Sequence, residues 1–252
     1  MCGIFGVITN NNNNVKDQIF DGLRRLEYRG YDSSGIATVS NNQINCVKSQ
    51  GNLDQLQKKL INEELIGNVG IGHTRWATHG VPNESNAHPH FTDEVAVVHN
   101  GIIENYALLK NQIVETGITF KSETDTEAIA HLITLYLKSG MSSYEAIRAT
   151  TEDIKGSYAL AIIMRSEPNK LFAVRKGSPL AVGSSEENSG QESLGIPVLA
   201  NSVQSLSMIS LSSSSQSFRA TKGKKLPKIY ASSRACVAPM VCFSDGTDLS
   251  KK

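Results

Sequence analysis

The sequence predicts an α+β fold in which antiparallel sheets are covered by helices. Its short apolar runs come in pairs joined by turn residues, and the helical patterns are grouped between those pairs. This order favours hairpins and antiparallel sheets over a parallel sheet built from alternating strands and helices. The chain has 252 residues, of which 39% are hydrophobic, so it can bury a core and has an ordinary globular composition.

Apolar spacing identifies the elements of the first hundred residues. Residues 4–8 form an apolar run that predicts a buried strand, and four aliphatic residues within 15–26 recur at helical spacing. The runs at 36–39 and 44–47 are joined by Ser-Asn-Asn-Gln, which predicts a hairpin. The remaining predicted elements are a helix marked by Leu53, Leu56 and Leu60, and strands at 69–72 and 95–99.

Helices dominate the next stretch of the chain, and a second hairpin follows them. The predicted elements are helices at 106–114, 126–137 and 144–154, a hairpin of 158–164 and 171–174, and a last short strand at 179–183. Ser122 or Thr124 is a candidate N-cap of the second helix, whose first turn carries two acidic residues that suit its dipole.

Charge and composition change near residue 184, and this change divides the chain into two predicted parts. Residues 1–183 carry 17 Lys/Arg and 19 Asp/Glu, whereas residues 184–252 carry 8 and 5 and are rich in serine. Periodicity is clear in the first part and weak in the second. We therefore expect one folded domain over 1–183. The tail over 184–252 is expected to be disordered, read out of frame or a divergent extension.

The overall charge excludes two classes of partner. A net charge of +1 provides no basic field for nucleic acid or for an anionic membrane surface. No stretch of about 18 apolar residues occurs, so we expect no membrane-spanning helix. The four cysteines form no C-x-x-C pair, which favours a reducing, cytoplasmic setting over a disulfide framework.

Cys2 is the first candidate for chemistry. It follows the initiator Met, and a small second residue favours removal of that Met. One residue would then carry a thiol nucleophile and an α-amine whose reference pKa of about 7.7–8.0 suits a general base. The alternative is that a small, buried cysteine merely opens the first strand.

The pair Asn100-Gly101 follows the apolar run at 95–99. An Asn amide and a Gly backbone N–H at a strand end can form an oxyanion hole for a tetrahedral acyl intermediate. The alternative is a hairpin turn, because Asn-Gly is a strong turn signal.

The segment HTRWATHG at 73–80 gathers polar groups where a strand passes into a loop. The Arg75 guanidinium matches a carboxylate with two parallel hydrogen bonds, although an exposed loop with an ion pair is the plainer interpretation. Asp125 could accept from a substrate ammonium group, or it could simply stabilise the N-terminus of its helix.

Two other groups of residues have competing interpretations. Six histidines suggest a metal, but no HExxH motif or paired CxxC occurs and a Pro separates two of the histidines, so we expect no metal. His88 and His99 are expected to be structural histidines with hydrogen-bond partners. Arg29 and Gly30 lie in a segment rich in turn formers, which is either a plain loop or a support for the nucleophile.

Taken in order, these segments resemble one protein family. They are MCGIFG (1–6), LEYRGYDSSGIA (26–37), HTRWATHG (73–80), NAHPH (86–90), VHNGIIEN (98–105) and SETDTEAIAHL (122–132). They are similar to the glutaminase domains of the glutamine–fructose-6-phosphate aminotransferases (isomerizing), which are class II glutamine amidotransferases. The resemblance extends through KGSYALAII (155–163) and KGSPLAVG (176–183) and so covers about residues 2–183.

The resemblance implies an N-terminal-nucleophile hydrolase fold, a four-layer αββα sandwich of two antiparallel sheets. It also implies an activity, the conversion of glutamine to glutamate and ammonia for amino sugar synthesis, with no cofactor. The implied roles are Cys2 as nucleophile, Asn100 and Gly101 as oxyanion hole, Arg75 and Asp125 as ligands of the glutamine α-carboxylate and α-ammonium, Trp76, Thr78 and His79 as pocket lining, and Arg29 and Gly30 as supports of the nucleophile.

This sequence departs from the family's pattern in two places. The family's motifs after position 183 have no counterpart here, and neither has the sugar-phosphate isomerase domain. Three functions therefore compete: an ammonia-releasing glutaminase domain, a truncated non-catalytic fragment, and a regulatory subunit that binds a separate synthase chain. Expected partners are glutamine and, as a candidate, an isomerase-domain chain.

Overall fold

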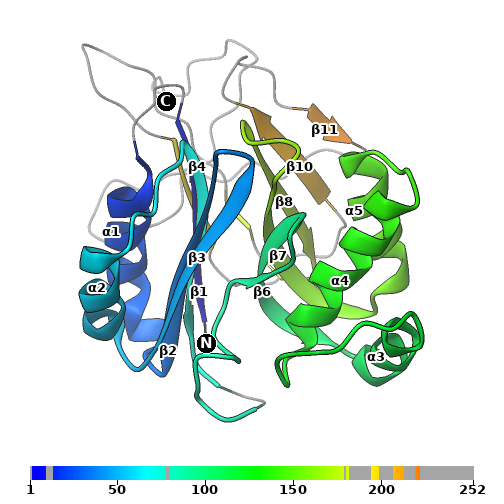
Figure 1. Cartoon of the computed structure of the whole chain (residues 1–252), viewed down its shortest axis with the longest axis horizontal. Coiled ribbons are helices and arrows are strands. Elements are labelled where there is room, and N and C mark those ends of the chain that lie inside the picture. Colours follow the sequence, from blue (N-terminus) through cyan, green and yellow to red (C-terminus); the bar gives the residue numbers. More distant parts are fainter. Residues whose placement is uncertain are drawn as a thin grey trace, which may run out of the picture.

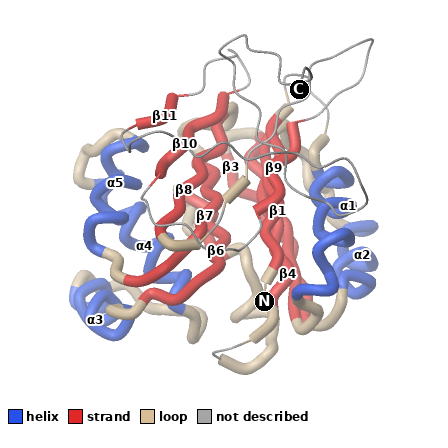
Figure 2. The backbone as a smooth tube through the Cα atoms, turned by 180° about the vertical axis from the view of Figure 1, so that it is seen from behind, coloured by secondary structure: helices blue, strands red, loops and turns tan. Residues whose placement is uncertain are grey.

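Two β-sheets face each other in the middle of the molecule, and helices cover the outer face of each (Figure 1). The computed structural model describes residues 2–9, 14–77, 80–178, 180–181, 194–198, 207–212 and 219–221, with only the backbone described for the last three segments and no side chain described for residue 29. From behind, the same four layers follow one another as helices, strands, strands and helices (Figure 2). The four-layer αββα sandwich expected from the resemblance is therefore confirmed.

All strand pairs within the two sheets are antiparallel. The first sheet has the order β3-β2-β4-β1-β9. Its strands are β1 (Gly3–Ile8), β2 (Ser33–Ser40), β3 (Gln43–Gln50), β4 (Val69–Arg75) and β9 (Leu194–Val198). The second sheet has the order β11-β10-β8-β7-β6-β5. Its strands are β5 (His90–Phe91), β6 (Val95–Ile103), β7 (Gly156–Met164), β8 (Lys170–Lys176), β10 (Ser207–Ser212) and β11 (Arg219–Thr221).

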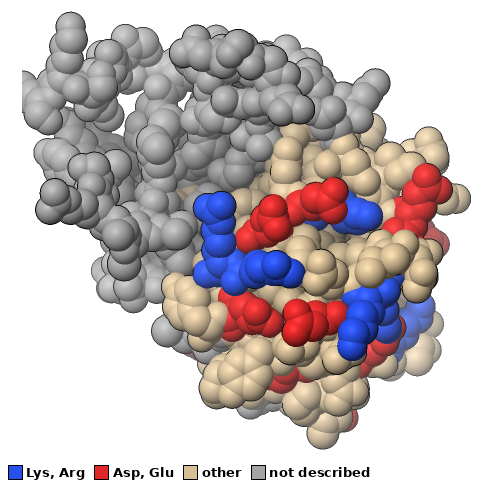
Figure 3. All heavy atoms as spheres, turned by 90° about the vertical axis from the view of Figure 1, so that its left-hand side faces the viewer, with Lys and Arg blue, Asp and Glu red and all other residues tan. Residues whose placement is uncertain are grey.

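In the described part of the chain, five α-helices and one short 3₁₀-helix cover the sheets. They are α1 (Lys16–Leu26), the 3₁₀-helix η1 (Glu27–Arg29), α2 (Leu53–Asn62), α3 (Tyr106–Glu115), α4 (Asp125–Lys138) and α5 (Ser143–Asp153). The first two α-helices lie on the first sheet, and the other three lie on the second (Figure 1). On the outer face of α1 and α2, Lys and Arg side chains alternate with Asp and Glu, so no field of one sign forms there (Figure 3).

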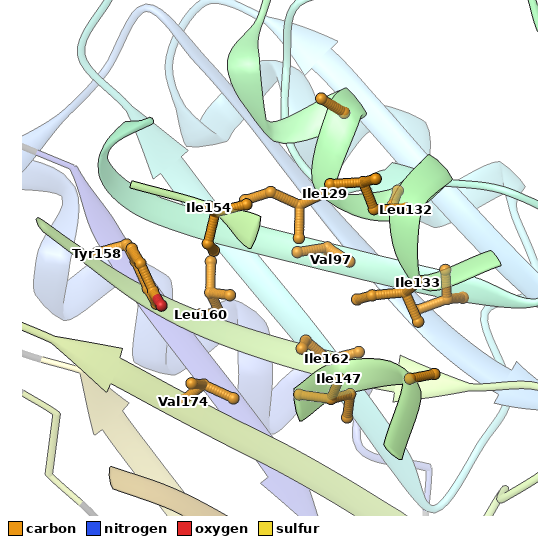
Figure 4. Packing of buried hydrophobic residues seen from close by; sticks show 14 of the residues in the cluster. Val97, Ile129, Leu132, Ile133, Ile147, Ile154, Tyr158, Leu160, Ile162 and Val174 are labelled. Carbon is orange, nitrogen blue, oxygen red and sulfur yellow. The ribbon is translucent and has the colours of Figure 1, made fainter. Parts of the chain in front are cut away.

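Side-chain alternation along β6 explains why the molecule has four layers. Val95 and Val97 belong to a cluster between the second sheet and its helices, where they meet residues of α4 and α5 such as Ile133 and Ile147 (Figure 4). Ala96 and Val98 point the other way, into the cluster between the two sheets. Both faces of this sheet are therefore buried. A third cluster joins the first sheet to α1 and α2.

Most of the expected elements are confirmed, and the differences concern strand ends. The two hairpins and all five α-helices form within a few residues of their predicted bounds. However, β4 and β6 continue to Arg75 and Ile103, because each has an antiparallel partner along its extra residues. The strand expected at 179–183 is wrong for residues 180 and 181, which lie outside any strand, and its other residues are not described. Thr124 occupies the N-cap position of α4 without a capping hydrogen bond from its side chain.

Three segments of the tail contribute strands to the sheets. The backbone of β9 pairs with β1, that of β10 pairs with β8, and β11 pairs with β10. A domain boundary at residue 183 stays a prediction, and most of the tail lies outside the described residues. Among the described helices, none has the length and apolar character needed to cross a membrane.

Candidate active site

The two sheets bring Cys2 and Asn100 together. Cys2 immediately precedes β1 in the first sheet, and Asn100 lies in β6 of the second. The Asn100 side-chain amide Nδ2 donates a hydrogen bond of 3.1 Å to the Cys2 carbonyl oxygen. The backbone N–H of Trp76, just after β4, donates to Cys2 Sγ at 3.3 Å. A thiol, an amide donor and a backbone N–H from three strands therefore meet at one place.

The local environment opposes ionisation of the Cys2 thiol. Burial raises the pKa of Cys2, and the carboxylate of Asp32 adds to this effect. The N–H of Trp76 and the Arg75 guanidinium act in the opposite direction, but the net pKa lies above its usual value. A thiol in this environment needs a base to remove its proton before it can act as a nucleophile.

Gly101 has a backbone conformation that a side chain would disrupt. Its φ is 138°, and a Cβ at this position would lie 2.0 Å from the Ser157 carbonyl oxygen. The Asn100-Gly101 pair lies inside β6, opposite Ala159 and Tyr158 of β7, and does not form the hairpin turn that the dipeptide alone would favour. Gly101 is exposed and directly follows Asn100. Its N–H and the Asn100 amide are therefore donors on adjacent residues of β6, close to Cys2.

Arg75 ends β4 and directly precedes Trp76, whose backbone N–H donates to Cys2 Sγ. Its side chain is almost fully buried, and Nη2 donates to the Gly80 carbonyl oxygen at 3.5 Å. Gly30 packs against the same backbone, since a Cβ there would lie 2.6 Å from the Arg75 carbonyl carbon and 2.9 Å from the Trp76 nitrogen. Gly30 is thus brought to the strand end that carries Arg75 and Trp76. The side chain of Arg29 and both Thr78 and His79 lie outside the described residues.

Asp125 begins α4 and is hydrogen-bonded to β6. Its Oδ2 accepts from the backbone N–H of Ile103 at 2.9 Å, and its Oδ1 lies 3.6 Å from His99 Nδ1. The Asp125 side chain is 26% exposed, so the carboxylate remains accessible. Its hydrogen bond to the strand that carries Asn100 goes beyond the helix-stabilising role that the sequence alone could assign.

The Trp76 side chain is exposed beside Cys2. It is 44% exposed and meets the ring of Tyr31 edge to face, with ring centroids 5.1 Å apart. The sequence pattern singled out Trp76 but not Tyr31. Both aromatic faces remain partly open to solvent.

Asp32 is a functional candidate that the sequence pattern did not single out. One carboxylate oxygen accepts from the Ala77 N–H, and the other accepts from the Ser33 hydroxyl at 2.9 Å. The Asp32 backbone N–H also donates to the Arg75 carbonyl oxygen at 3.2 Å. These bonds hold the backbone on both sides of Trp76. An Asp within the turn-rich segment at 29–35 was the available signal, because Asp commonly bonds nearby backbone N–H groups.

Four buried histidines, His73, His88, His90 and His99, lie close together, and His73 contacts the Asn100 side chain. The rings of His73 and His88 stack with centroids 4.2 Å apart, and the His90 ring meets His88 edge to face at 4.8 Å. His88 Nε2 and His99 Nδ1 lie 2.7 Å and 3.0 Å from the Thr126 hydroxyl, in accord with the structural role expected for both. Within the described part of the chain, no three His, Cys, Asp or Glu residues are arranged to hold a metal ion.

Burial favours the neutral form of three of these imidazoles. It lowers the pKa of His73 and His90 to about 3 and that of His88 well below the usual value. The rings of His73, His88 and His90 therefore favour the neutral form at neutral pH.

The sequence matches a known protein family and several curated proteins. Residues 73–190 match the family model described as a glutamine amidotransferase domain. The glutamine–fructose-6-phosphate aminotransferase (isomerizing) of Bartonella henselae is 52% identical over 183 residues, which are 73% of this chain and 30% of the relative. One from Rhizobium meliloti is 48% identical over 200 residues, or 79% and 32% of the two chains. This chain spans about a third of the length of the curated relatives it matches.

Two solved structures share the fold. The glutamine phosphoribosylpyrophosphate amidotransferase of B. subtilis, solved with ADP and GMP, has a TM-score of 0.68 at 24% identity, over 88% of this chain and 49% of that one. A structure described as the allosteric regulatory enzyme of purine biosynthesis has a TM-score of 0.71 at 23% identity, with the same coverage. The architecture is thus that of the N-terminal-nucleophile hydrolases. With the matches to its sequence, the chain contains a class II glutamine amidotransferase domain.

Proposed function

We propose that this chain hydrolyses the side-chain amide of glutamine through a thioester on Cys2 and releases glutamate and ammonia. The observation that carries the proposal is the meeting of Cys2 with the Asn100 amide, whose Nδ2 lies 3.1 Å from the Cys2 carbonyl oxygen. Nδ2 has two hydrogens, so one can bond this carbonyl while the other points to a substrate. The N–H of Trp76 at Cys2 Sγ supports the assignment of the thiol as nucleophile.

The reaction needs a base next to Cys2, because burial raises the pKa of its thiol. We propose that Met1 is removed and that the α-amine of Cys2 takes the thiol proton. The sulfur attacks the amide carbon of glutamine, and the oxyanion accepts from Asn100 Nδ2–H and the Gly101 N–H. The protonated amine then gives its proton to the leaving nitrogen, and ammonia departs. Water hydrolyses the thioester by the same proton route.

Glutamine is a zwitterion, so its head needs a cation and an anion. We assign its α-carboxylate to Arg75 and its α-ammonium to Asp125. The almost complete burial of Arg75 and the hydrogen bond from the Ile103 N–H to Asp125 hold these two charges in place. In the same proposal Trp76, Thr78 and His79 line the pocket, and Arg29 and Gly30 support the nucleophile. A site that pairs buried polar groups with its substrate rejects analogues that leave those groups unpaired.

The use of the ammonia is the finer part of the proposal. The matched relatives are named for transfer to fructose-6-phosphate, and this chain corresponds to about a third of their length. We propose that the ammonia serves amino sugar synthesis, with an isomerase domain supplied by a separate chain or by a longer form of this one. A pull-down with a purified isomerase domain tests the first arrangement.

The Cys2→Ala variant tests the nucleophile. We expect it to abolish glutamate release, because no other described thiol lies in the site. The matched control is Cys46→Ala, which removes the other described thiol from β3 and should keep the activity. The measurement is glutamate production by purified protein, together with mass spectrometry of the intact chain. Full activity of Cys2→Ala, or retention of Met1 in active protein, would refute the mechanism.

The Asn100→Ala variant tests the oxyanion hole. Loss of one oxyanion donor costs about 10²–10³ in kcat, and we expect a decrease in this range with a much smaller change in KM. Steady-state glutamate release at several glutamine concentrations separates the two constants. An increase in KM alone would assign Asn100 to substrate binding and contradict the proposed role.

A further inference from the structure

His73 of β4 is hydrogen-bonded to the side-chain oxygen of Asn100, the proposed oxyanion donor. Its side chain is fully buried, and its Nε2 lies 3.0 Å from Asn100 Oδ1 and 3.2 Å from the His99 carbonyl oxygen. The contact joins the two sheets, since His73 belongs to the first and Asn100 to the second. No step of the proposed reaction uses this histidine directly.

The neighbours of His73 determine which of its nitrogens carries the proton. The His99 carbonyl oxygen can only accept a hydrogen bond, so Nε2 must carry the hydrogen that faces it. On the other side, the ring stacks on His88, and among the described atoms Nδ1 has no hydrogen-bond partner that would accept a second proton. The ring is therefore a neutral imidazole protonated at Nε2.

This protonation state also determines the orientation of the Asn100 amide. With Nε2–H as donor, the atom facing His73 must be the acceptor Oδ1, which leaves the Nδ2 amino group directed at Cys2. If the amide were flipped, its amino group would meet the Nε2–H donor and its oxygen would meet the Cys2 carbonyl oxygen. The flip would replace two hydrogen bonds by two contacts between like partial charges.

We propose that His73 is a positioning residue that holds the Asn100 amide with its N–H groups toward the reacting carbonyl. The inference rests on the proposed glutaminase function. It extends that function by one residue, since His73 acts only through Asn100. A preorganised donor stabilises an oxyanion because it does not have to reorient when charge develops. Without His73, the amide can adopt both orientations, and one of them presents an oxygen to the oxyanion.

Replacing His73 by Gln or by Asn, which carry the same amide group, distinguishes the loss of the hydrogen bond to Asn100 from the loss of side-chain volume. In His73→Gln the side-chain nitrogen reaches the place of Nε2 and can still donate to Asn100 Oδ1, whereas in His73→Asn it reaches only the place of Nδ1. We expect His73→Asn to lower kcat by about 10- to 100-fold with KM changed less than about threefold. His73→Gln should stay within about fivefold of the wild type. His90→Asn, a buried histidine that makes no contact with Asn100, serves as the matched control with kcat within about twofold.

A double-mutant cycle distinguishes positioning from a general structural role. In the Asn100→Ala background, His73→Asn should have no further effect on kcat, because the amide that it positions is gone. Equal decreases of kcat in both backgrounds would overturn the proposal, and so would equal kcat values for His73→Asn and His73→Gln. Should His73→Asn fail to fold, His73→Phe keeps a ring against His88, lacks the donor and carries the same prediction.

The wild-type protein separates this inference from the proposed function. If it releases no glutamate, the proposed function fails, and the inference that rests on it fails too. If the wild type is active while the His73 variants behave as their controls do, only the inference is overturned.

Discussion

At Gly30 the absence of a methyl group leaves room for the backbone of Arg75 and Trp76, which contacts Cys2. A Cβ there would lie 2.6 Å and 2.8 Å from the carbonyl carbon and oxygen of Arg75, and 2.9 Å from the Trp76 nitrogen. These are backbone atoms, so they cannot rotate away as a side chain could. The displaced nitrogen is the donor to Cys2 Sγ. We expect Gly30→Ala to lower kcat/KM for glutamate release by about tenfold or more, because small displacements of reacting groups are costly.

A second glycine provides the control for this prediction. Gly117 has a φ of 88° and no atom within 4 Å of an added Cβ. Gly117→Ala should therefore lose about 1 kcal/mol of stability from backbone strain, without a change in activity. Thermal unfolding and glutamate release are measured for both variants. Wild-type activity in Gly30→Ala would show that the backbone at Arg75 can move without effect on the site.

Some residues of the candidate site could be predicted from the sequence, and others could not. Cys2, Asn100, Arg75 and Asp125 were named from the chemistry of glutamine and from ordered motifs. The contact between His73 and Asn100 was not predictable, because it joins positions 27 residues apart on two different sheets. Only the packing of those sheets brings the ring to the amide.

At the scale of elements, pairing overrides local turn preference. Asn-Gly is a strong hairpin signal, yet Asn100 and Gly101 lie inside β6 because β7 pairs with them. In the first hairpin the turn preference agrees with the pairing, since Asn41 and Asn42 have φ values of 51° and 57°. Helices were predictable from apolar spacing alone, as in α1, where one face is buried. The ends of β4 and β6 were not, because they depend on the partner strand.

The junction of α1 with the first sheet leads to a prediction about packing. Gly22 of α1 lies over Phe5 of β1, and a Cβ at Gly22 would meet three ring atoms at 2.4–2.5 Å. Helix propensity alone would favour Gly22→Ala by about 1 kcal/mol. Overpacking by this much costs up to about 3 kcal/mol. We therefore expect a net loss of about 2 kcal/mol in the free energy of unfolding, measured by urea denaturation.

Removing the Phe5 ring should recover part of the free energy of unfolding that Gly22→Ala loses. Phe5→Leu replaces the ring by a smaller side chain, so Gly22→Ala should cost less in the Phe5→Leu background than in the wild type. Equal costs in both backgrounds would show that the ring is not the obstacle.

At the scale of the whole molecule, the packing of the sheets and of the start of α4 buries several imidazoles. Periodicity predicted antiparallel sheets and helices but could not give the number of sheets, which only the resemblance to a family implied; β6, for example, is apolar on both faces. The same arrangement encloses His73, His88 and His90, which are at most 5% exposed. An enclosed histidine that stays neutral binds fewer protons than the unfolded chain does below the unfolded pKa of about 6.5.

The pH dependence of stability follows from this difference. Burial lowers the pKa of His73 and His90 to about 3 and that of His88 well below its usual value. For His90, Lys48 acts in the same direction and Glu127 acts against it. Because the folded pKa values are depressed, the stability is fully present above about pH 6.5 and is lost as the pH falls toward 3. His73 and His90 each contribute up to about 1.4 kcal/mol per pH unit within this window, and His88 acts in the same direction.

We therefore expect the free energy of unfolding to fall by at least about 2 kcal/mol between pH 6 and pH 5 from His73 and His90, with His88 acting in the same direction, measured by urea denaturation. Glu127 acts in a separate window, because burial would raise its pKa but hydrogen bonds from His131, Lys121 and Ser122 lower it to about 2. Its contribution is lost only below about pH 4.5. In His90→Asn the slope between pH 6 and pH 5 should decrease by about one proton. A free energy that stays constant from pH 7 to pH 5 would mean that these imidazoles accept protons in the folded state. The orientation proposed for Asn100 does not depend on this result, because a protonated His73 would still donate from Nε2–H to Asn100 Oδ1.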